Sequence, residues 1–63
     1  MFINSQQAII SLLKHGFSEQ KIADKTRISQ ASVHKIKSGT VRNPRVDTAE
    51  KIENLYLKVV GHS

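Results

Sequence analysis

The sequence predicts an all-α fold of four helices within one domain. Apolar residues recur at helical spacing in four segments, and no segment alternates apolar and polar residues with period two. The three glycines each stand where a periodic segment ends, as expected of residues that accept a positive φ after a helix. At 63 residues the chain is shorter than most single domains, so we assign residues 1–63 to one domain.

The first helix is expected over residues 5–15. Asn4 is a favourable N-cap, and Gln7 stands three residues later in the arrangement of a capping box. Gly16 is expected to end the helix. Its inward stripe is formed by Ala8, Ile9, Leu12 and Leu13.

The second and third helices are expected over residues 19–26 and 30–38, and both begin in the same way. A serine, Ser18 or Ser29, caps each helix, and the apolar residue before it is placed to pack on the fourth helical position. Gly39 is expected to end the third helix. The apolar side chains of this pair are Phe17, Ile22, Ala23, Ile28, Val33 and Ile36.

The fourth helix is expected over about residues 46–60, with a start between Arg45 and Asp47. Asp47 and Glu50 have the spacing of a capping box. The inward stripe comprises Ala49, Ile52, Leu55, Tyr56 and Val59. Two further apolar residues, Leu57 and Val60, fall off that stripe.

Residues 18–39 have the layout of a helix-turn-helix. Only Arg27, Ile28 and Ser29 separate the two helices, and a turn this short between apolar anchors fixes them at a steep angle. The second helix of such a pair places its N-terminal residues in the major groove of DNA, where base edges differ in their hydrogen-bonding groups.

Positive charge is concentrated in the middle of the chain. The net charge is +5, and residues 25–45 hold six of the ten basic residues but none of the five acidic ones. Such a segment either forms a solvated basic face or binds a polyanion.

Several function classes find no support. The absence of cysteine excludes disulfides and thiolate chemistry, and fits a cytoplasmic protein. The three histidines share no close spacing, so no metal site is expected, and no glycine-rich phosphate loop indicates a nucleotide cofactor. No apolar run approaches the roughly 20 residues of a membrane span, and no secretory signal is visible. We therefore expect neither an enzyme nor a membrane protein.

The stretch 18–39 and the segment Arg42-Asn-Pro-Arg45 with the helix after it resemble the lambda-repressor/Cro-like family of helix-turn-helix DNA-binding proteins. The resemblance covers about residues 5–59. It implies a sequence-specific transcriptional regulator, namely a Cro-like phage or prophage repressor that binds a pseudo-palindromic operator as a homodimer at the nucleoid. The motifs in register are Ile22-Ala23, Ile28-Ser-Gln30, Val33-x-x-Ile36, Ser38-Gly39 and Asn43-Pro44.

The resemblance also assigns candidate contact residues. Gln30 can pair with adenine, Lys35 with guanine, and the Ala31 methyl group can meet thymine. The full set of base-reading candidates is Gln30, Ala31, Ser32, His34 and Lys35. Phosphate contacts are expected from Ser18, Gln20, Ser29, Lys37, Ser38, Thr40, Arg42, Asn43 and Arg45.

The sequence departs from the family pattern in three places. Arg27 occupies a turn position that is usually glycine, so either it keeps a positive φ at a cost of roughly 1 kcal/mol or the turn is reshaped. Glu19 replaces the usual glutamine and cannot donate to a phosphate. The usual fifth helix is expected to be lacking, which leaves apolar surface for a dimer interface formed by Tyr56, Leu57 and Val60, together with Phe2 and Ile3.

A different class of function remains open. The same helices could form a protein-interaction module, such as an antitoxin-type or host-factor-binding protein, in which DNA binding is secondary. RNA binding is a weaker alternative, because it usually requires exposed aromatic platforms. The three aromatic residues of this chain have structural positions instead.

Overall fold

The computed structural model describes residues 4–61 and confirms the all-α prediction. No strand occurs among these residues, and Phe2, Ile3 and the tail after Gly61 lie outside them. No helix in this part of the chain is long and apolar enough to cross a membrane. The four helices are α1 (Ser5–Lys14), α2 (Glu19–Thr26), α3 (Gln30–Ser38) and α4 (Val46–Val59).

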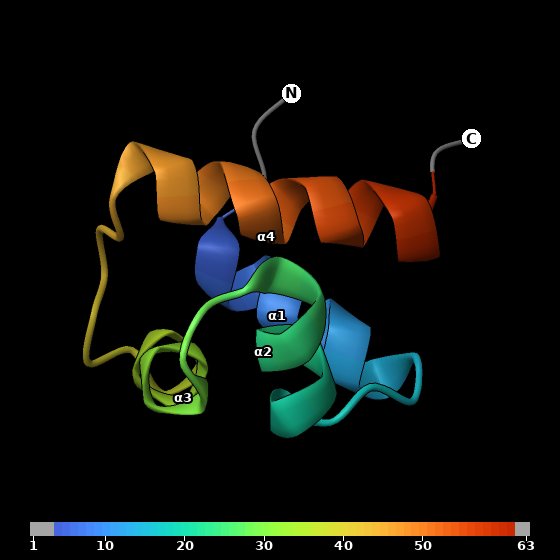
Figure 1. The fold of residues 1–63 in the computed structure, drawn as a ribbon, viewed down its shortest axis with the longest axis horizontal. Helices are drawn as coiled ribbons and strands as arrows, with labels where there is room; N and C mark the ends of the chain where they lie inside the picture. The colour runs from blue at the N-terminus through green and yellow to red at the C-terminus, as the bar shows by residue number, and fades with distance from the viewer. Residues whose placement is uncertain (1–3, 62–63) are drawn as a thin grey trace.

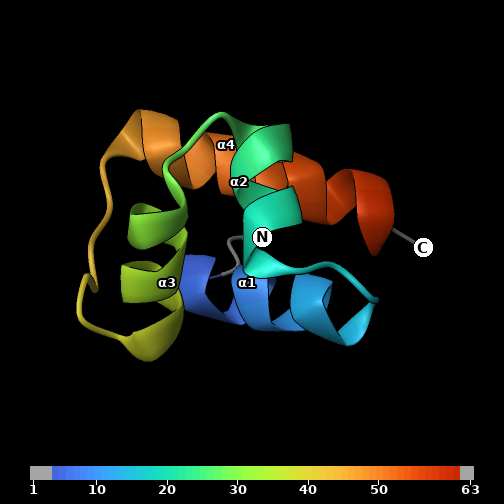
Figure 2. The same ribbon diagram turned by 60° about the horizontal axis from the view of Figure 1, so that its bottom comes forward.

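The longest helix, α4, runs along the long axis of the molecule, and α1 and α2 lie beneath it (Figure 1). Helix α3 stands at one end of the domain, nearly end-on in Figure 1 and side-on in Figure 2. The segment 40–45 passes around the outside of that end before it enters α4. Helix α3 thus has one side against the domain and one side facing outward.

Each helix contributes at least one side chain to a single apolar core. The core residues are Ala8, Ile9, Leu12, Ile22, Ala23, Val33, Ile36 and Ile52. Phe17 and Ile28, which precede the caps of α2 and α3, are half-buried and pack against this core. Since burial of a large aliphatic side chain stabilises by about 1.5–3 kcal/mol, these contacts hold α2 and α3 in place.

Side-chain caps fix the starts of the first three helices. Asn4 Oδ1 accepts from the Gln6 N–H at 2.7 Å, Ser18 Oγ from the Lys21 N–H at 3.0 Å, and Ser29 Oγ from the Ser32 N–H at 3.1 Å. The predicted caps are therefore confirmed. The capping box with Gln7 is not formed, because the Asn4 side chain accepts from the Gln6 N–H and not from the Gln7 N–H. The first helix ends at Lys14, with His15 as its C-cap.

The predicted capping box of the fourth helix is wrong. Helix α4 begins at Val46, so Arg45 occupies the cap position and makes no side-chain cap bond. Asp47 lies inside the first turn, where its Oδ1 accepts from the adjacent Thr48 N–H at 2.9 Å. A carboxylate in the first turn complements the helix dipole. Acidic residues are therefore favoured there as well as at the cap, and the sequence pattern did not separate the two positions.

Candidate nucleic-acid interface

The turn between α2 and α3 is tight because Arg27 adopts the left-handed conformation, with φ 60° and ψ 33°. The Ile28 N–H then reaches back to the Ala23 carbonyl at 3.2 Å. Thr26 is buried, and its hydroxyl donates to the Ile22 carbonyl at 2.6 Å, a role that the sequence pattern did not reveal. Of the two alternatives for this turn, Arg27 thus keeps the positive φ, at a cost of roughly 1 kcal/mol, and the turn is not reshaped.

The inner face of α3 is anchored by two side chains. Val33 and Ile36 are 0% and 2% exposed and belong to the same core as Ile22 and Ala23. At Ala23, which is 6% exposed, the small side chain lets the helices approach closely. This packing fixes the rotation of α3 and therefore decides which of its residues point outward.

The outward face of α3 carries most of the expected base-reading residues. Gln30, Ala31, His34 and Lys35 are all exposed. Ser32 differs, since it is half-buried and its Oγ accepts from the Ser29 hydroxyl at 2.9 Å. Ser32 is therefore part of the cap at the start of α3 as well as a candidate reader.

The expected phosphate-binding residues differ in how free their side chains are. Arg42, Asn43 and Arg45 are exposed on the segment that leads to α4. The amide of Gln20 donates to Asp24 at 3.1 Å. The Ser38 and Thr40 hydroxyls lie 3.0 Å apart and share a hydrogen bond. The first three side chains are the freest to meet a phosphate, because they make no such bond among the described residues.

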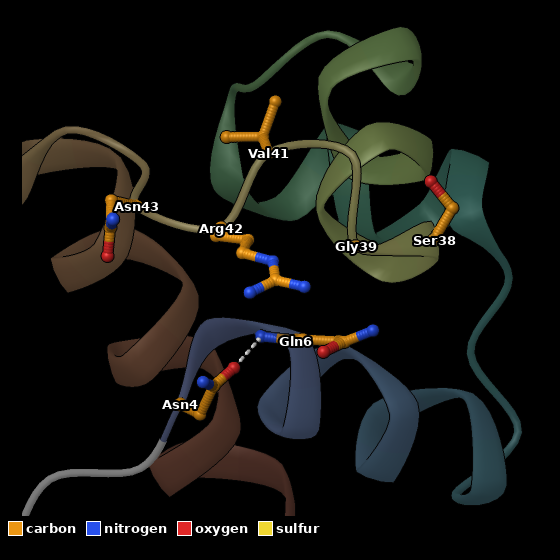
Figure 3. A pocket seen from close by; sticks show the side chains of 7 residues that line it. All are labelled: Asn4, Gln6, Ser38, Gly39, Val41, Arg42 and Asn43. Atoms are coloured by element: carbon orange, nitrogen blue, oxygen red, sulfur yellow. Dashed lines mark hydrogen bonds between the residues drawn. The ribbon is translucent and has the colours of Figure 1, made fainter.

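A polar hollow of about 600 Å³ lies between the start of α1 and the end of α3 (Figure 3). The Arg42 guanidinium points across it toward Asn4 and Gln6, which the sequence patterns did not single out for this surface. Gln6 Nε2 donates to the Lys37 carbonyl at 2.9 Å and so ties α1 to the last turn of α3. The lining residues are Asn4, Gln6, Ser38, Gly39, Val41, Arg42 and Asn43.

Basic side chains of the segment 25–45 line two different hollows. Arg42 lines the hollow beside α1, whereas Lys25 and Arg27 line a separate hollow of about 260 Å³ with Lys51 and Lys58 of α4. The two groups line different hollows because the tight turn leaves Lys25 and Arg27 beside α4. That the segment binds a polyanion stays a prediction.

Lys37 and His34 share an acidic partner on α2. Glu19 Oε2 lies 2.8 Å from Lys37 Nζ and 3.1 Å from His34 Nδ1. The hydrogen bond from Lys37, followed by that from His34, lowers the pKa of Glu19 below its ordinary value of 4.5. The Glu19 side chain is 20% exposed, so solvent screens part of this effect. Lys37, expected at a phosphate, is thus already in an ion pair.

The expected dimer residues lie at the end of α4 and at its C-cap, Val60. Leu57 is 45% exposed, whereas Tyr56 and Val60 are half-buried and Tyr56 packs against the core. Val46, at the start of the same helix, is 76% exposed, although the sequence patterns did not mark it. Residues 46, 53, 57 and 60 recur at intervals of seven, four and three, so they follow one outer stripe.

Within residues 4–61, no group of three or more histidine and acidic side chains is placed to hold a metal ion. The acidic residues of α4 include Asp47, which bonds to the backbone. The exposed polar groups around α3 are hydrogen-bond donors and acceptors aimed at solvent. Such groups can form hydrogen bonds and charge interactions with a ligand.

Comparison with known proteins agrees with this geometry. A family described as "Helix-turn-helix" matches residues 10–56. The chain is 32% identical over 57 residues to "Putative protein P2" of Acyrthosiphon pisum secondary endosymbiont phage 1. That match covers 90% of this chain and 61% of the phage protein, so the chain spans about three fifths of the relative's length. No solved structure gives a significant match.

Proposed function

The chain belongs to the lambda-repressor/Cro-like helix-turn-helix family of DNA-binding regulators, and on this premise we propose that it is a sequence-specific repressor. It acts at the nucleoid of a bacterial or phage-infected cell, where it binds a pseudo-palindromic operator as a homodimer. Residues 4–61 act as one DNA-binding unit, and bound protein blocks access to a promoter.

The observation that carries this proposal is the outward row on α3. Gln30, Ala31, His34 and Lys35 are exposed along one side of a helix whose other side is fixed by buried Val33 and Ile36. A helix of this kind fits the major groove, and its first residues reach base edges. Preset rotation matters because a recognition helix must present the same side chains to every site.

The specific contacts follow from the chemistry of the exposed side chains. Gln30 offers an amide that can pair with both N6 and N7 of adenine, and Lys35 donates to O6 and N7 of guanine. Ala31 meets the thymine methyl group, and Ser32 and His34 complete the reading set. Each well-formed bidentate pair discriminates by about 1–3 kcal/mol.

Sequence-independent affinity comes from the edges of the same face. We assign phosphate contacts to exposed Arg42, Asn43 and Arg45, with Asn4 and Gln6 lining the adjacent hollow. Further hydroxyl and amide contacts come from Ser18, Gln20, Ser29, Ser38 and Thr40. Binding is then salt-dependent, because each neutralised phosphate releases counterions.

The homodimer is supported by the exposed apolar residues of α4. Leu57 and Val46 expose large parts of their side chains, and burial between two copies removes this apolar surface from water. Tyr56 and Val60 adjoin them. A two-fold dimer of this kind reads two half-sites about one helical turn apart. The similarity to a phage protein supports a phage or prophage origin.

Selection from a random duplex pool at near-physiological salt tests the proposal. Enrichment of an inverted repeat is the expected result. A single unpaired half-site would retain DNA reading and remove the dimer, and sedimentation of the free and bound protein checks the stoichiometry independently. Weak, salt-sensitive binding without enrichment would overturn the proposal in favour of the protein-interaction alternative, for which exposed Val46 and Leu57 offer a surface.

A further inference from the structure

We propose that Glu19 is a positioning residue that presents His34 to DNA as a hydrogen-bond acceptor and withdraws Lys37 from phosphate binding. The inference rests on the proposed function, since it specifies how the same face reads DNA. Its basis is one carboxylate at the start of α2 that bonds to two side chains of α3. These side chains stand three residues apart and therefore lie on neighbouring turns of one face.

The Glu19 carboxylate determines which nitrogen of the His34 ring carries the hydrogen. An ionised carboxylate only accepts hydrogen bonds, so the 3.1 Å contact with Glu19 places the hydrogen on Nδ1. In the neutral ring the other nitrogen, Nε2, then carries a lone pair and accepts. The lowered pKa of Glu19 keeps the carboxylate ionised at neutral pH. Glu19 therefore selects one of the two tautomers.

The Nε2 acceptor of His34 is free to pair with a hydrogen-bond donor on a base edge. The His34 side chain is 60% exposed, on the same outward face as Gln30 and Lys35. In the major groove an acceptor pairs with the exocyclic amines of cytosine (N4) and adenine (N6). His34 is thus expected to favour one of these bases at a single position, whereas the opposite tautomer would favour an acceptor such as guanine N7 or thymine O4.

The same carboxylate neutralises Lys37. Its Nζ lies 2.8 Å from Glu19 Oε2, and its side chain is only 34% exposed. The pair leaves no local excess of positive charge to displace counterions from DNA. Among the described residues, Glu19 is the acidic partner in both ion pairs. Lys37 thus contributes little to the salt dependence of binding while Glu19 is present.

Nitrogen-detected NMR of ¹⁵N-histidine-labelled protein without DNA tests which ring nitrogen of His34 carries the hydrogen. At a pH where the histidines are neutral, His34 is expected to show hydrogen on Nδ1, and Glu19→Ala is expected to shift it toward the Nε2–H form. His15 is an internal control, because its Nδ1 donates to the Ser11 carbonyl at 2.9 Å, far from this change. A His34 ring with hydrogen on Nε2 in the wild type would overturn the inference and leave the proposed function untouched.

Binding measurements on the selected duplex test the withdrawal of Lys37 from phosphate binding. Glu19→Gln is expected to raise affinity for all duplexes and to steepen the dependence on salt by about one unit, because it frees Lys37. Lys37→Ala is expected to leave the salt slope unchanged in the wild type and to lower it by about one unit in the Glu19→Gln protein. A full unit lost from the wild type on Lys37→Ala would overturn the withdrawal of Lys37.

The base preference of two variants tests the reading role of His34 and the positioning role of Glu19. His34→Ala and Glu19→Ala are expected to lose the same preference, by about 2- to 10-fold, at the same base pair. Loss of preference in His34→Ala alone would overturn the positioning role of Glu19. If no variant and no wild-type protein selects DNA while His34 keeps its Nδ1 hydrogen, the proposed function fails, and with it the reading role, but not the tautomer.

Discussion

Helices α3 and α4 both bury one side and expose the other, yet their exposed sides differ in chemistry. The outward side of α3 carries amide, imidazole and ammonium groups, whereas the outer stripe of α4 carries Val46 and Leu57 with Glu53 between them and continues to the C-cap Val60. The first surface suits base edges and phosphates, and the second suits another apolar surface. Under the proposed function, the difference would divide DNA reading and self-association between two helices of one small domain.

The starts of the two helices differ in the same sense. Ser29 caps α3 through the Ser32 N–H, whereas Arg45 makes no side-chain cap bond at the start of α4. A recognition helix needs a fixed first turn, because its first residues read bases. Helix α4 begins next to the loop that carries Arg42 and Asn43, and its cap position holds a basic residue that adds no cap bond but is assigned to phosphate binding under the proposed function.

The largest expected effect comes from removing the anchor that the two helices share with the core. Ile36→Ala in α3 and Ile52→Ala in α4 are each expected to lower the free energy of unfolding by about 2–5 kcal/mol, because both side chains are buried. Urea unfolding followed by circular dichroism measures the loss. Glu50→Ala on the exposed side of α4 is the control, with an expected change within about 0.5 kcal/mol.

Substitutions on the outward side of α3 are expected to separate reading from charge. Gln30→Ala and Lys35→Ala should each weaken binding to the selected operator by about 1–3 kcal/mol and relax preference at one base pair. Fluorescence anisotropy with matched and mismatched duplexes measures both quantities. Lys58→Ala on α4 is a charge-matched control that should leave the preference intact. Equal losses on specific and random DNA would show that α3 does not read bases.

The contrast between the caps predicts an effect of opposite sign at the two helix starts. Ser29→Ala is expected to lower the free energy of unfolding by about 1 kcal/mol, because it removes the bond to the Ser32 N–H. Arg45→Ser is expected to raise it by about 0.5–1 kcal/mol by adding a missing cap. Thermal unfolding without DNA measures both. A loss of stability in Arg45→Ser would mean that Arg45 has a structural role.

The smallest effect is the pH dependence that Glu19 adds at the side of α3. Folding lowers the pKa of Glu19 from 4.5, chiefly through Lys37 and then through His34. The unfolded chain therefore takes up the proton first as pH falls, so this stabilisation is complete above about pH 4.5 and is lost as pH drops through the folded pKa. Urea unfolding between pH 3 and pH 7 is expected to show a flatter acid limb in Glu19→Gln. Identical acid limbs would contradict this prediction.

Local sequence determined the helices and most of their packing. The caps Asn4, Ser18 and Ser29 and the glycine at the end of α3 act within one turn, so their effects follow from neighbouring residues. The inward sides of α2 and α3 follow from helical periodicity in the same way. The sequence left two alternatives for Arg27, a positive φ or a reshaped turn, and the structure has the positive φ.

Only the tertiary structure decided which side chains meet across helices. Glu19 and His34 are 15 residues apart, and Gln6 and Lys37 are 31 apart, so no helical period relates them. Their contacts depend on the crossing of α1, α2 and α3 around the core. The same crossing places Lys25 and Arg27 at one hollow and Arg42 at another, although the three lie in one basic run of the sequence. Sequence spacing sets the face of each helix, and core packing sets which faces adjoin.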